Sequence, residues 1–496
     1  PLEVGVEFDA VGRVDVDVLD LAALSIWRRA VKVCLNELWW LQNKKESAMN
    51  QTQVQMKGVL IHGSTIEGQT RYDGIYPAHA DAIQVSSNRW MILYSNRGFM
   101  GDDNYKSLVY QIRRDSLDGP LVREGILEKS RSFQLDHDES TTYSTQLGSP
   151  HMFGVPKGLE KLHPAGNANI FVARWYIRHN LLRRASEGTL KLSANRILPG
   201  IRSSGVQWVQ YKLNESEDDI EIIQAPSMFT QKGFEESDSF CELGPDITMN
   251  HGFSRPFPLN DDQTHWCDVI TAGGIAPVKF EFNPSMGKYE WTEVGTRIGD
   301  ADYSLGEPSI VQVNDSFIIA ARTGERGWNK PNWKMKKGTI AWVRLDDPFS
   351  YNSYEIIYPE DARNGRAAPF TLAKMADEGL RVFSNDDYNS PYPELNRNPL
   401  YVWDIDPGQG FQRMNRQVVY DGVALQLPGA PNANFVHLVT HSGGDKQFFT
   451  FFESHKLTTP ISDQVRQLYP REEEANVYYG AIQFDRECPS EWGFNG

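Results

Sequence analysis

Residues 73–113 read DGIYPAHADAIQVSSNRWMILYSNRGFMGDDNYKSLVYQIR, and this stretch decides the fold expected for the chain. Apolar runs at 82–85 and 90–94 flank the polar turn SSNR at 86–89, a pattern typical of a β-hairpin. A third apolar run follows at 107–113. Three antiparallel strands separated by polar turns make most of one propeller blade, and we expect the rest of the chain to repeat this unit.

The repeat is followed through the positions of the polar turns. Turn centres recur near Asn88, Gly166, Glu215, Asn260, Asn314, Asp377 and Gly443. Their mean interval is roughly 59 residues, slightly above the longest known blade repeats. We therefore predict an all-β propeller of seven blades over residues 51–496. Six or eight blades remain alternative counts, because the spacing is uneven between the first and fourth turns.

Residues 1–50 differ from the remainder. Apolar side chains at helical spacing in 19–41 predict an N-terminal extension with one amphipathic helix. The four cysteines show no CxxC pair and no metal-ligand spacing. A disulfide between Cys241 and Cys267 is one reading, and free buried thiols are the favoured one.

Composition excludes several classes of function. The 13 Trp, 20 Tyr, 40 Gly and 27 Pro are typical of a globular chain rich in strands and turns. The net charge of −15 argues against general nucleic-acid binding, which needs basic surfaces that displace phosphate counterions. We expect no membrane helix, because no apolar stretch reaches roughly 18 residues, and no signal peptide. We also expect a monomer, and the compartment stays open.

Arginine closes three of the apolar runs. Arg97 ends MILYSNR, Arg174 ends NIFVAR and Arg322 ends SFIIAAR. In a propeller the inner strands converge on a central funnel, so residues from separate repeats can share one site. Guanidinium groups bind carboxylates through two parallel hydrogen bonds. The three arginines therefore predict a site for a carboxylate-bearing sugar, and the alternative is that they are structural.

Histidines are the candidates for proton transfer. His79 precedes the first predicted hairpin strand, His151 lies in SPHMFGVPKG and His251 lies in NHGFSRPF. Imidazole exchanges protons near neutral pH, and loop segments beside strands are where functional residues gather. His437 and His441 share one strand face, but without nearby cysteine or carboxylate spacing they make only a weak metal pair.

A carboxylate and a tyrosine complete the set of candidates. Glu307 in LGEPSIVQV stands before a strand whose partner ends in Arg322. A glycosidase would need either two carboxyl groups about 5–10 Å apart or a tyrosine nucleophile activated by a glutamate such as Glu307. Candidate tyrosines are Tyr176, Tyr388, Tyr478 and Tyr479. Most tyrosines of this chain are expected to be core residues.

The segments GEPSIVQVNDSFIIAARTGE, NRNPLYVWDIDP and NVYYGAIQF resemble the sialidase-like superfamily of β-propeller carbohydrate enzymes. The resemblance covers most of the chain after residue 50. The SxDxGxxW pattern of many true sialidases is not evident, and HGFSRPF is only loosely similar to their first-arginine motif. The earlier segments HADAIQVSSNRWMILYSNRGFMGDD, GVPKG and ANIFVARW are more similar to seven-bladed lyases that cleave at uronic acids, such as ulvan lyases and rhamnosyl-glucuronate lyases.

By that resemblance His79 is the leading base or acid, with Tyr176 and His151 as its partners. The substrate-binding residues placed by pattern are Arg97, Arg174, His251, Glu307, Arg322 and Arg397. The implied reaction is β-elimination: a base removes the C5 proton of a uronate while arginine neutralises its carboxylate and the C4 oxygen leaves.

We therefore predict a lyase acting on a uronate-containing poly- or oligosaccharide. The alternatives are an exo-glycoside hydrolase that acts on an acidic sugar through Glu307, and a non-catalytic glycan- or protein-binding propeller. No redox cofactor and no metal site are expected, and a structural cation is left open. The resemblance implies a secreted or periplasmic location.

Overall fold

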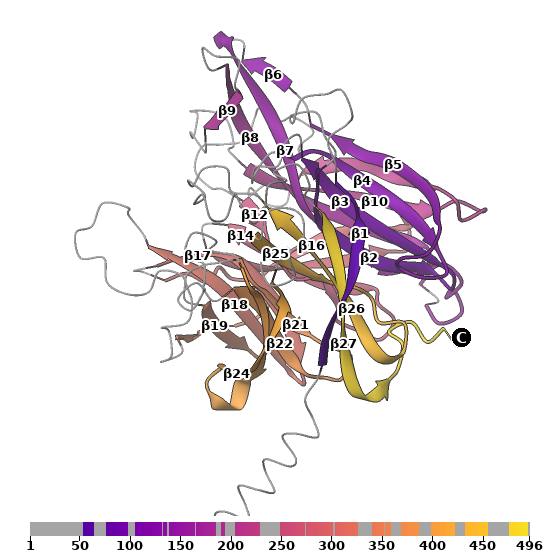
Figure 1. Cartoon of the computed structure of the whole chain (residues 1–496), viewed down its shortest axis with the longest axis vertical. Helices are drawn as coiled ribbons and strands as arrows, with labels where there is room; N and C mark the ends of the chain where they lie inside the picture. Colours follow the sequence, from indigo (N-terminus) through magenta and orange to yellow (C-terminus); the bar gives the residue numbers. More distant parts are fainter. Residues whose placement is uncertain are drawn as a thin grey trace, which may run out of the picture. The chain divides into compact units, whose positions relative to one another are not determined.

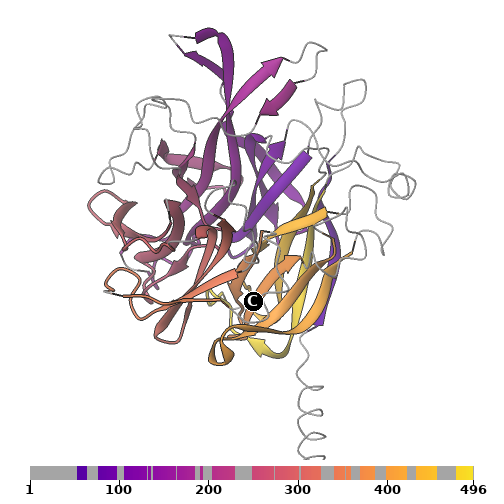
Figure 2. The same ribbon diagram turned by 90° about the vertical axis from the view of Figure 1, so that its left-hand side faces the viewer.

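The fold is seen in the part of the chain that follows residue 52. The computed structural model describes residues 53–63, 76–97, 105–130, 132–135, 138–163, 165–184, 190–193, 204–228, 249–272, 274–300, 303–325, 340–351, 353–358, 369–385, 398–421, 432–454 and 476–494. The predicted helical extension at 1–50 lies outside the described residues. Residues 53–496 form one compact unit, whose described strands make six antiparallel sheets (Figures 1 and 2).

The first three sheets follow one another along the chain. The first contains, from the axis outward, β2 (Tyr76–Ser86), β3 (Arg89–Arg97), β4 (Tyr105–Arg114) and β5 (Leu121–Lys129). The second contains β7 (Asp138–Val155), β8 (Ile170–Arg184), β10 (Ser204–Leu213) and β11 (Ile220–Met228), with β6 (Ser132–Leu135) on β7 and β9 (Leu190–Ser193) on β8. The third contains β12 (Met249–His251) and β13 (Phe257–Pro258), which both pair with β14 (His265–Ala272), then β15 (Ile275–Asn283) and β16 (Lys288–Val294).

The last three sheets complete the ring. The fourth contains β17 (Tyr303–Val313), β18 (Ser316–Glu325), β19 (Ile340–Leu345) and β20 (Ile356–Ile357). The fifth contains β21 (Thr371–Lys374), β22 (Leu380–Asn385), β23 (Leu400–Asp406) and β24 (Gln412–Tyr420), with the short 3₁₀ helix η2 (Pro407–Gln409) between the last two strands. The sixth contains β25 (Asn432–Leu438), β26 (Gly444–Ser454), β27 (Val477–Cys488) and, as its outermost strand, β1 (Gln53–Ile61). The strand that begins the described chain therefore closes the ring.

The hydrophobic core lies between the sheets. Six clusters of buried side chains are present among the described residues, and each draws on neighbouring sheets. Phe153 and Trp266, for example, join the second sheet to the third, and Phe383 and Phe451 join the fifth to the sixth. The sixth sheet packs on the first through β25 and β2. Burial at all six interfaces closes the propeller without an exposed sheet edge at the axis.

The predicted all-β propeller is confirmed, but the predicted seven blades are wrong, because the described residues form six. The turn near Glu215 joins β10 to β11, which are the outer two strands of the second sheet. Each of the other six turn centres lies between an innermost strand and its neighbour. Inner and outer hairpins have the same alternation of apolar runs and polar turns. The sequence pattern therefore counts the outer turn near Glu215 as the centre of a separate blade, which raises the predicted number to seven. Cys267 and Cys488 are free and buried.

Candidate functional site

The two ends of the innermost strands are chemically different. Tyr76 at the start of β2 pairs with Arg97 at the end of β3, and Gly306 near the start of β17 pairs with Arg322 near the end of β18. The arginines that close second strands therefore lie where the innermost strands begin, which we call the strand-start end. The tight turns between innermost and second strands lie at the opposite end, the hairpin end.

Four of the innermost strands contain a β-bulge. The residue at each bulge has a positive φ although it is not glycine. These residues are His79 (φ 47°), Ser149 (52°), Glu307 (47°) and Phe435 (53°), and the strand register shifts at each of them. A left-handed conformation costs an L-residue about 1–2 kcal/mol, and bulges re-aim side chains. Two of the predicted site residues, His79 and Glu307, occupy this strained position.

The bulge of the fourth sheet carries an exposed ion pair. Glu307 Oε2 lies 2.5 Å from Arg322 Nη1, and the two side chains are 23% and 29% exposed. A Cβ added to the preceding Gly306 would meet no atom of the described residues within 4 Å. The exposed fractions of Glu307 and Arg322 make both groups partly accessible to a ligand.

The bulge of the first sheet is closed over by aromatic rings. The His79 ring is buried, with centroid distances of 4.2 Å to Phe435 and 4.5 Å to Phe452. Arg97 is also buried, and its Nε and Nη2 donate to the backbone carbonyls of Tyr76 (3.3 Å) and Pro77 (3.2 Å). These two predicted residues therefore lie in the interior of the propeller, against rings of the sixth sheet.

Arg174 of β8 is held in a buried ion pair with Asp268 of β14. Its Nε and Nη2 donate to the two carboxylate oxygens, and the guanidinium also donates to the carbonyls of Gly252 and Ser254. Both side chains are 1% exposed. Burial raises the pKa of Asp268, and the neighbouring Arg174 opposes that rise. The pair thus ties the second sheet to the third.

Three imidazoles of the innermost strands β2, β7 and β25 lie close together. The His437 ring of β25 lies 4.5 Å from the His151 ring and 6.2 Å from the His79 ring, centroid to centroid. Burial, with a smaller contribution from Arg174, lowers the pKa of His437 to about 3. The structure therefore brings two of the predicted catalytic residues together around a third histidine that stays neutral near neutral pH.

Asp81 lies two residues beyond His79 on the same strand. It accepts hydrogen bonds from the backbone N–H groups of Met152 (2.6 Å) and Ala82 (3.0 Å). Burial raises its pKa to about 6, against the opposing effects of Arg255, these two hydrogen bonds and Arg174. Sequence reasoning missed Asp81, although it stands in the HADA segment that was singled out.

Tyr176 lies against the first sheet. Its ring is buried in the cluster that contains Ala78 and Ala80, the two neighbours of His79. Gly148, its partner on β7, allows this placement, because a Cβ at Gly148 would overlap the phenol ring. His251 is described only through its backbone in β12, and Arg397 lies outside the described residues.

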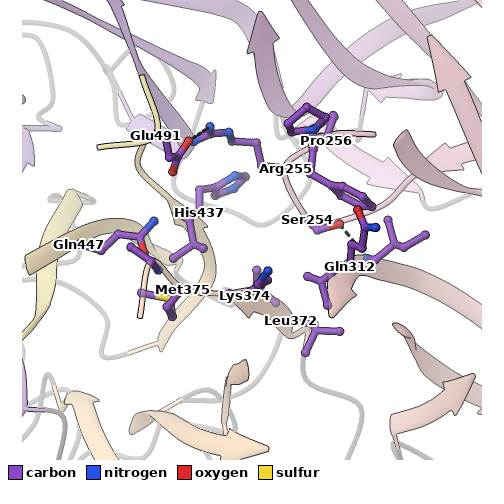
Figure 3. A pocket seen from close by; sticks show the side chains of 18 of the residues that line it. Ser254, Arg255, Pro256, Gln312, Leu372, Lys374, Met375, His437, Gln447 and Glu491 are labelled. Carbon is purple, nitrogen blue, oxygen red and sulfur yellow. Dashed lines mark hydrogen bonds and ion pairs between the residues drawn. The ribbon is translucent and has the colours of Figure 1, made fainter. Parts of the chain in front are cut away.

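Sequence reasoning also missed a cavity of 370 Å³ at the hairpin end. Arg255 and Glu491 lie side by side on its wall, the His437 ring points into it, and Lys374 and Gln312 line it further round (Figure 3). Arg255 stands in the quoted HGFSRPF segment. Phe253, Ser254, Pro256 and Phe257 of the lining stand in the same segment. The remaining lining residues come from other parts of the chain and share no sequence signal.

No group of three or more His, Cys, Asp or Glu side chains arranged for a metal ion occurs among the residues the structure describes. His441 Nε2 lies 3.3 Å from the carbonyl of Cys488. Over the same residues, the structure has no helix with the length and hydropathy needed to cross a bilayer.

No protein-family model matches the chain, and no curated protein matches it. Among solved structures it is similar to a Dyadobacter fermentans protein of unknown function, at 8% identity and a TM-score of 0.49 over 85% of this chain and 98% of that one. It is also similar to the Trypanosoma rangeli sialidase (9%, 0.47, 86% and 59%) and to the NanB sialidase of Streptococcus pneumoniae (8%, 0.48, 84% and 70%). The chain thus spans 59% of the trypanosomal sialidase. At these identities and TM-scores the likenesses assign neither a family nor an activity.

Proposed function

We propose that this propeller is a carbohydrate-active enzyme that hydrolyses an acidic saccharide at the strand-start end of the fourth sheet. The observation that carries the proposal is the ion pair of Glu307 and Arg322. Of the predicted site residues whose side chains are described, these two are the ones with exposed functional groups. Glu307 is moreover held at a strained φ of 47°, and such strain gathers at functional sites.

The chemistry of the pair suits a sugar that carries a carboxylate. A guanidinium has five N–H donors, and the recorded contact with Glu307 uses the donor on Nη1. The remaining donors can hold a ligand carboxylate, which guanidinium groups bind in a planar, bidentate manner. A sugar anchored in this way would place its glycosidic oxygen near the Glu307 carboxyl group. Glu307 would then take a proton from the water that adds to the anomeric carbon and deliver it to the glycosidic oxygen as the C–O bond breaks.

Elimination is the second candidate, and the position of Tyr176 favours it. Tyr176 packs with the residues on either side of His79, so the predicted base and its predicted partner lie in one region of the core. Both rings are buried. A uronate lyase is therefore supported only by the closeness of Tyr176 to His79 in the core. Hydrolysis is supported by Glu307 and Arg322, whose side chains a substrate can reach.

The experiment is to incubate the full chain with oligosaccharides that contain glucuronate or sialate, in water enriched in ¹⁸O. Hydrolysis places the label on the released reducing end and creates no double bond. Elimination produces the ultraviolet absorbance of an unsaturated uronate and no label. Binding without either product would contradict both enzymatic readings and favour a glycan-binding propeller.

Two variants test the residues, each with a control from the same sheet. Glu307→Gln is expected to lower kcat by about 10²–10⁴-fold, the usual contribution of a general acid or base. Arg322→Lys is expected to raise KM by about tenfold, because the planar fork is lost. Glu355→Gln and Arg344→Lys make the same changes at exposed positions and should leave both constants unchanged. Equal activity of Glu307→Gln and Glu355→Gln would refute the assignment.

A further inference from the structure

The cavity at the hairpin end lies apart from the Glu307 and Arg322 pair. Gln312, which lines the cavity, follows Glu307 by five positions on β17. Strands rise about 3.3 Å per residue, so these positions are roughly 16 Å apart along the strand. The 370 Å³ volume falls in the range of about 300–1,000 Å³ that is usual for small-molecule sites.

The positive and negative charges of the side chains that line the cavity sum to zero. Arg255 Nη2 lies 2.7 Å from Glu491 Oε2, and Lys374 Nζ lies 2.6 Å from Glu378 Oε2. His437 is neutral near neutral pH because burial lowers its pKa to about 3. Two cations and two carboxylates leave no net charge for an ionic ligand to neutralise. The lining therefore favours a neutral ligand with hydrogen-bonding groups.

Four buried polar atoms of residues that line the cavity have no hydrogen-bond partner among the described residues. They are both ring nitrogens of His437, Nε1 of Trp492 and Oε1 of Gln263. His437 is 3% exposed and Trp492 is 4% exposed. A buried polar group without a partner costs about 1–3 kcal/mol. These atoms include donors and acceptors, and a hydroxyl group can serve either kind.

Aromatic residues and prolines form part of the remaining lining. These residues are Phe253, Phe257, Trp266, Trp492, Pro256 and Pro258. Rings of this kind bury large apolar areas, and the C–H faces of a pyranose pack on them while its hydroxyl groups reach sideways to polar atoms. A pyranose combines both requirements of this lining in one ligand.

We propose that the cavity at the hairpin end is a second saccharide site. It binds one neutral pyranose unit between its aromatic lining residues and the His437 ring. The Arg255–Glu491 and Lys374–Glu378 pairs supply donors and acceptors at its edge. This site goes beyond the hydrolysis proposed at the strand-start end, because its ligand class is neutral and its residues are different.

The test uses glucose, galactose, mannose and N-acetylglucosamine as probes, with glucuronate as the acidic counterpart of glucose. Binding to the full chain is followed by calorimetry and by tryptophan fluorescence, since Trp266 and Trp492 line the cavity. At least one neutral sugar is expected to bind and to change the fluorescence, and glucuronate is expected to bind at least tenfold more weakly than glucose. Failure of all four neutral sugars to bind, or equal binding of glucuronate, would overturn the proposal.

Matched variants place the binding in the cavity. Gln312→Trp adds an indole inside the cavity, and Asp315→Trp adds the same group at an exposed turn of the same hairpin. The first is expected to weaken sugar binding at least tenfold and the second to leave it unchanged. His437→Phe keeps a ring but removes both nitrogens, and it is expected to weaken binding by a similar factor. It serves as the second variant if Gln312→Trp does not fold, and unchanged binding in either folded cavity variant would contradict the assignment.

Discussion

The first and fourth sheets share a backbone arrangement and differ in what surrounds it. In both, a bulge residue at φ 47° lies on the innermost strand and an arginine lies near the end of the second strand. His79 and Arg97 are buried beneath rings of the sixth sheet, whereas Glu307 and Arg322 are partly exposed. The repeated fold thus supplies the position, and the neighbouring side chains decide whether a ligand can reach it.

The same contrast holds for the two ion pairs of predicted arginines. Arg174 and Asp268 are each 1% exposed, whereas Arg322 and Glu307 are 29% and 23% exposed. A buried pair that loses one partner leaves an uncompensated charge in a low-dielectric interior. An exposed pair gains little from its Coulomb attraction, because solvent screens it.

The largest expected effect comes from one chemical change made in both pairs. Asp268→Asn should lower the free energy of unfolding by about 3–5 kcal/mol, because Arg174 stays buried without its counter-charge. Glu307→Gln should change it by no more than about 1 kcal/mol. Urea unfolding of the two variants measures the difference. Equal losses of stability would show that the buried and the partly exposed ion pair do not differ in environment.

Asp81, which is buried in the first sheet, makes the stability of the chain depend on pH. This dependence tests how strongly the interior of that sheet is shielded from solvent. Burial raises its pKa from 3.8 to about 6, so the folded chain binds more protons than the unfolded chain between these values. The contribution of Asp81 to stability is therefore present below pH 3.8 and is lost as the pH rises to about 6. At about 1.4 kcal/mol per unit, the loss is about 3 kcal/mol.

Asp81→Asn removes this titration. The stability of the variant relative to the parent chain should therefore improve by about 3 kcal/mol between pH 3.5 and pH 7. Burial lowers the pKa of His437 to about 3, which changes stability in the opposite direction. That contribution is common to both chains and cancels in the difference. Urea unfolding across this pH range provides the measurement, and a difference that does not vary with pH would contradict the raised pKa.

The sequence pattern predicted the strands, the ring and the neighbouring positions of Glu307 and Arg322, because these follow from local alternation and from hairpin pairing. It could not predict which arginines are buried. Asp268 stands 94 residues from Arg174 in the chain, and the rings over His79 come from the sixth sheet. The cavity likewise combines residues of four sheets and the C-terminal segment. Contacts between sheets depend on closure of the ring, which leaves no periodic signal in the sequence.

The smallest expected change in stability comes from two glycines that occupy equivalent positions in the second and fourth sheets. Gly148 and Gly306 each precede the bulge residue of an innermost strand. A Cβ at Gly148 would lie 2.7 Å from Cε1 of Tyr176 and closer still to the outer atoms of its ring, whereas a Cβ at Gly306 would meet no described atom within 4 Å. Gly148→Ala should therefore lower stability by about 1–3 kcal/mol through overpacking, and Gly306→Ala should leave it nearly unchanged. Thermal unfolding compares the two variants. Equal destabilisation of the two variants would show that the space beside Glu307 is filled. A sugar could then not reach Glu307, and the contrast between the buried first sheet and the accessible fourth sheet would be refuted.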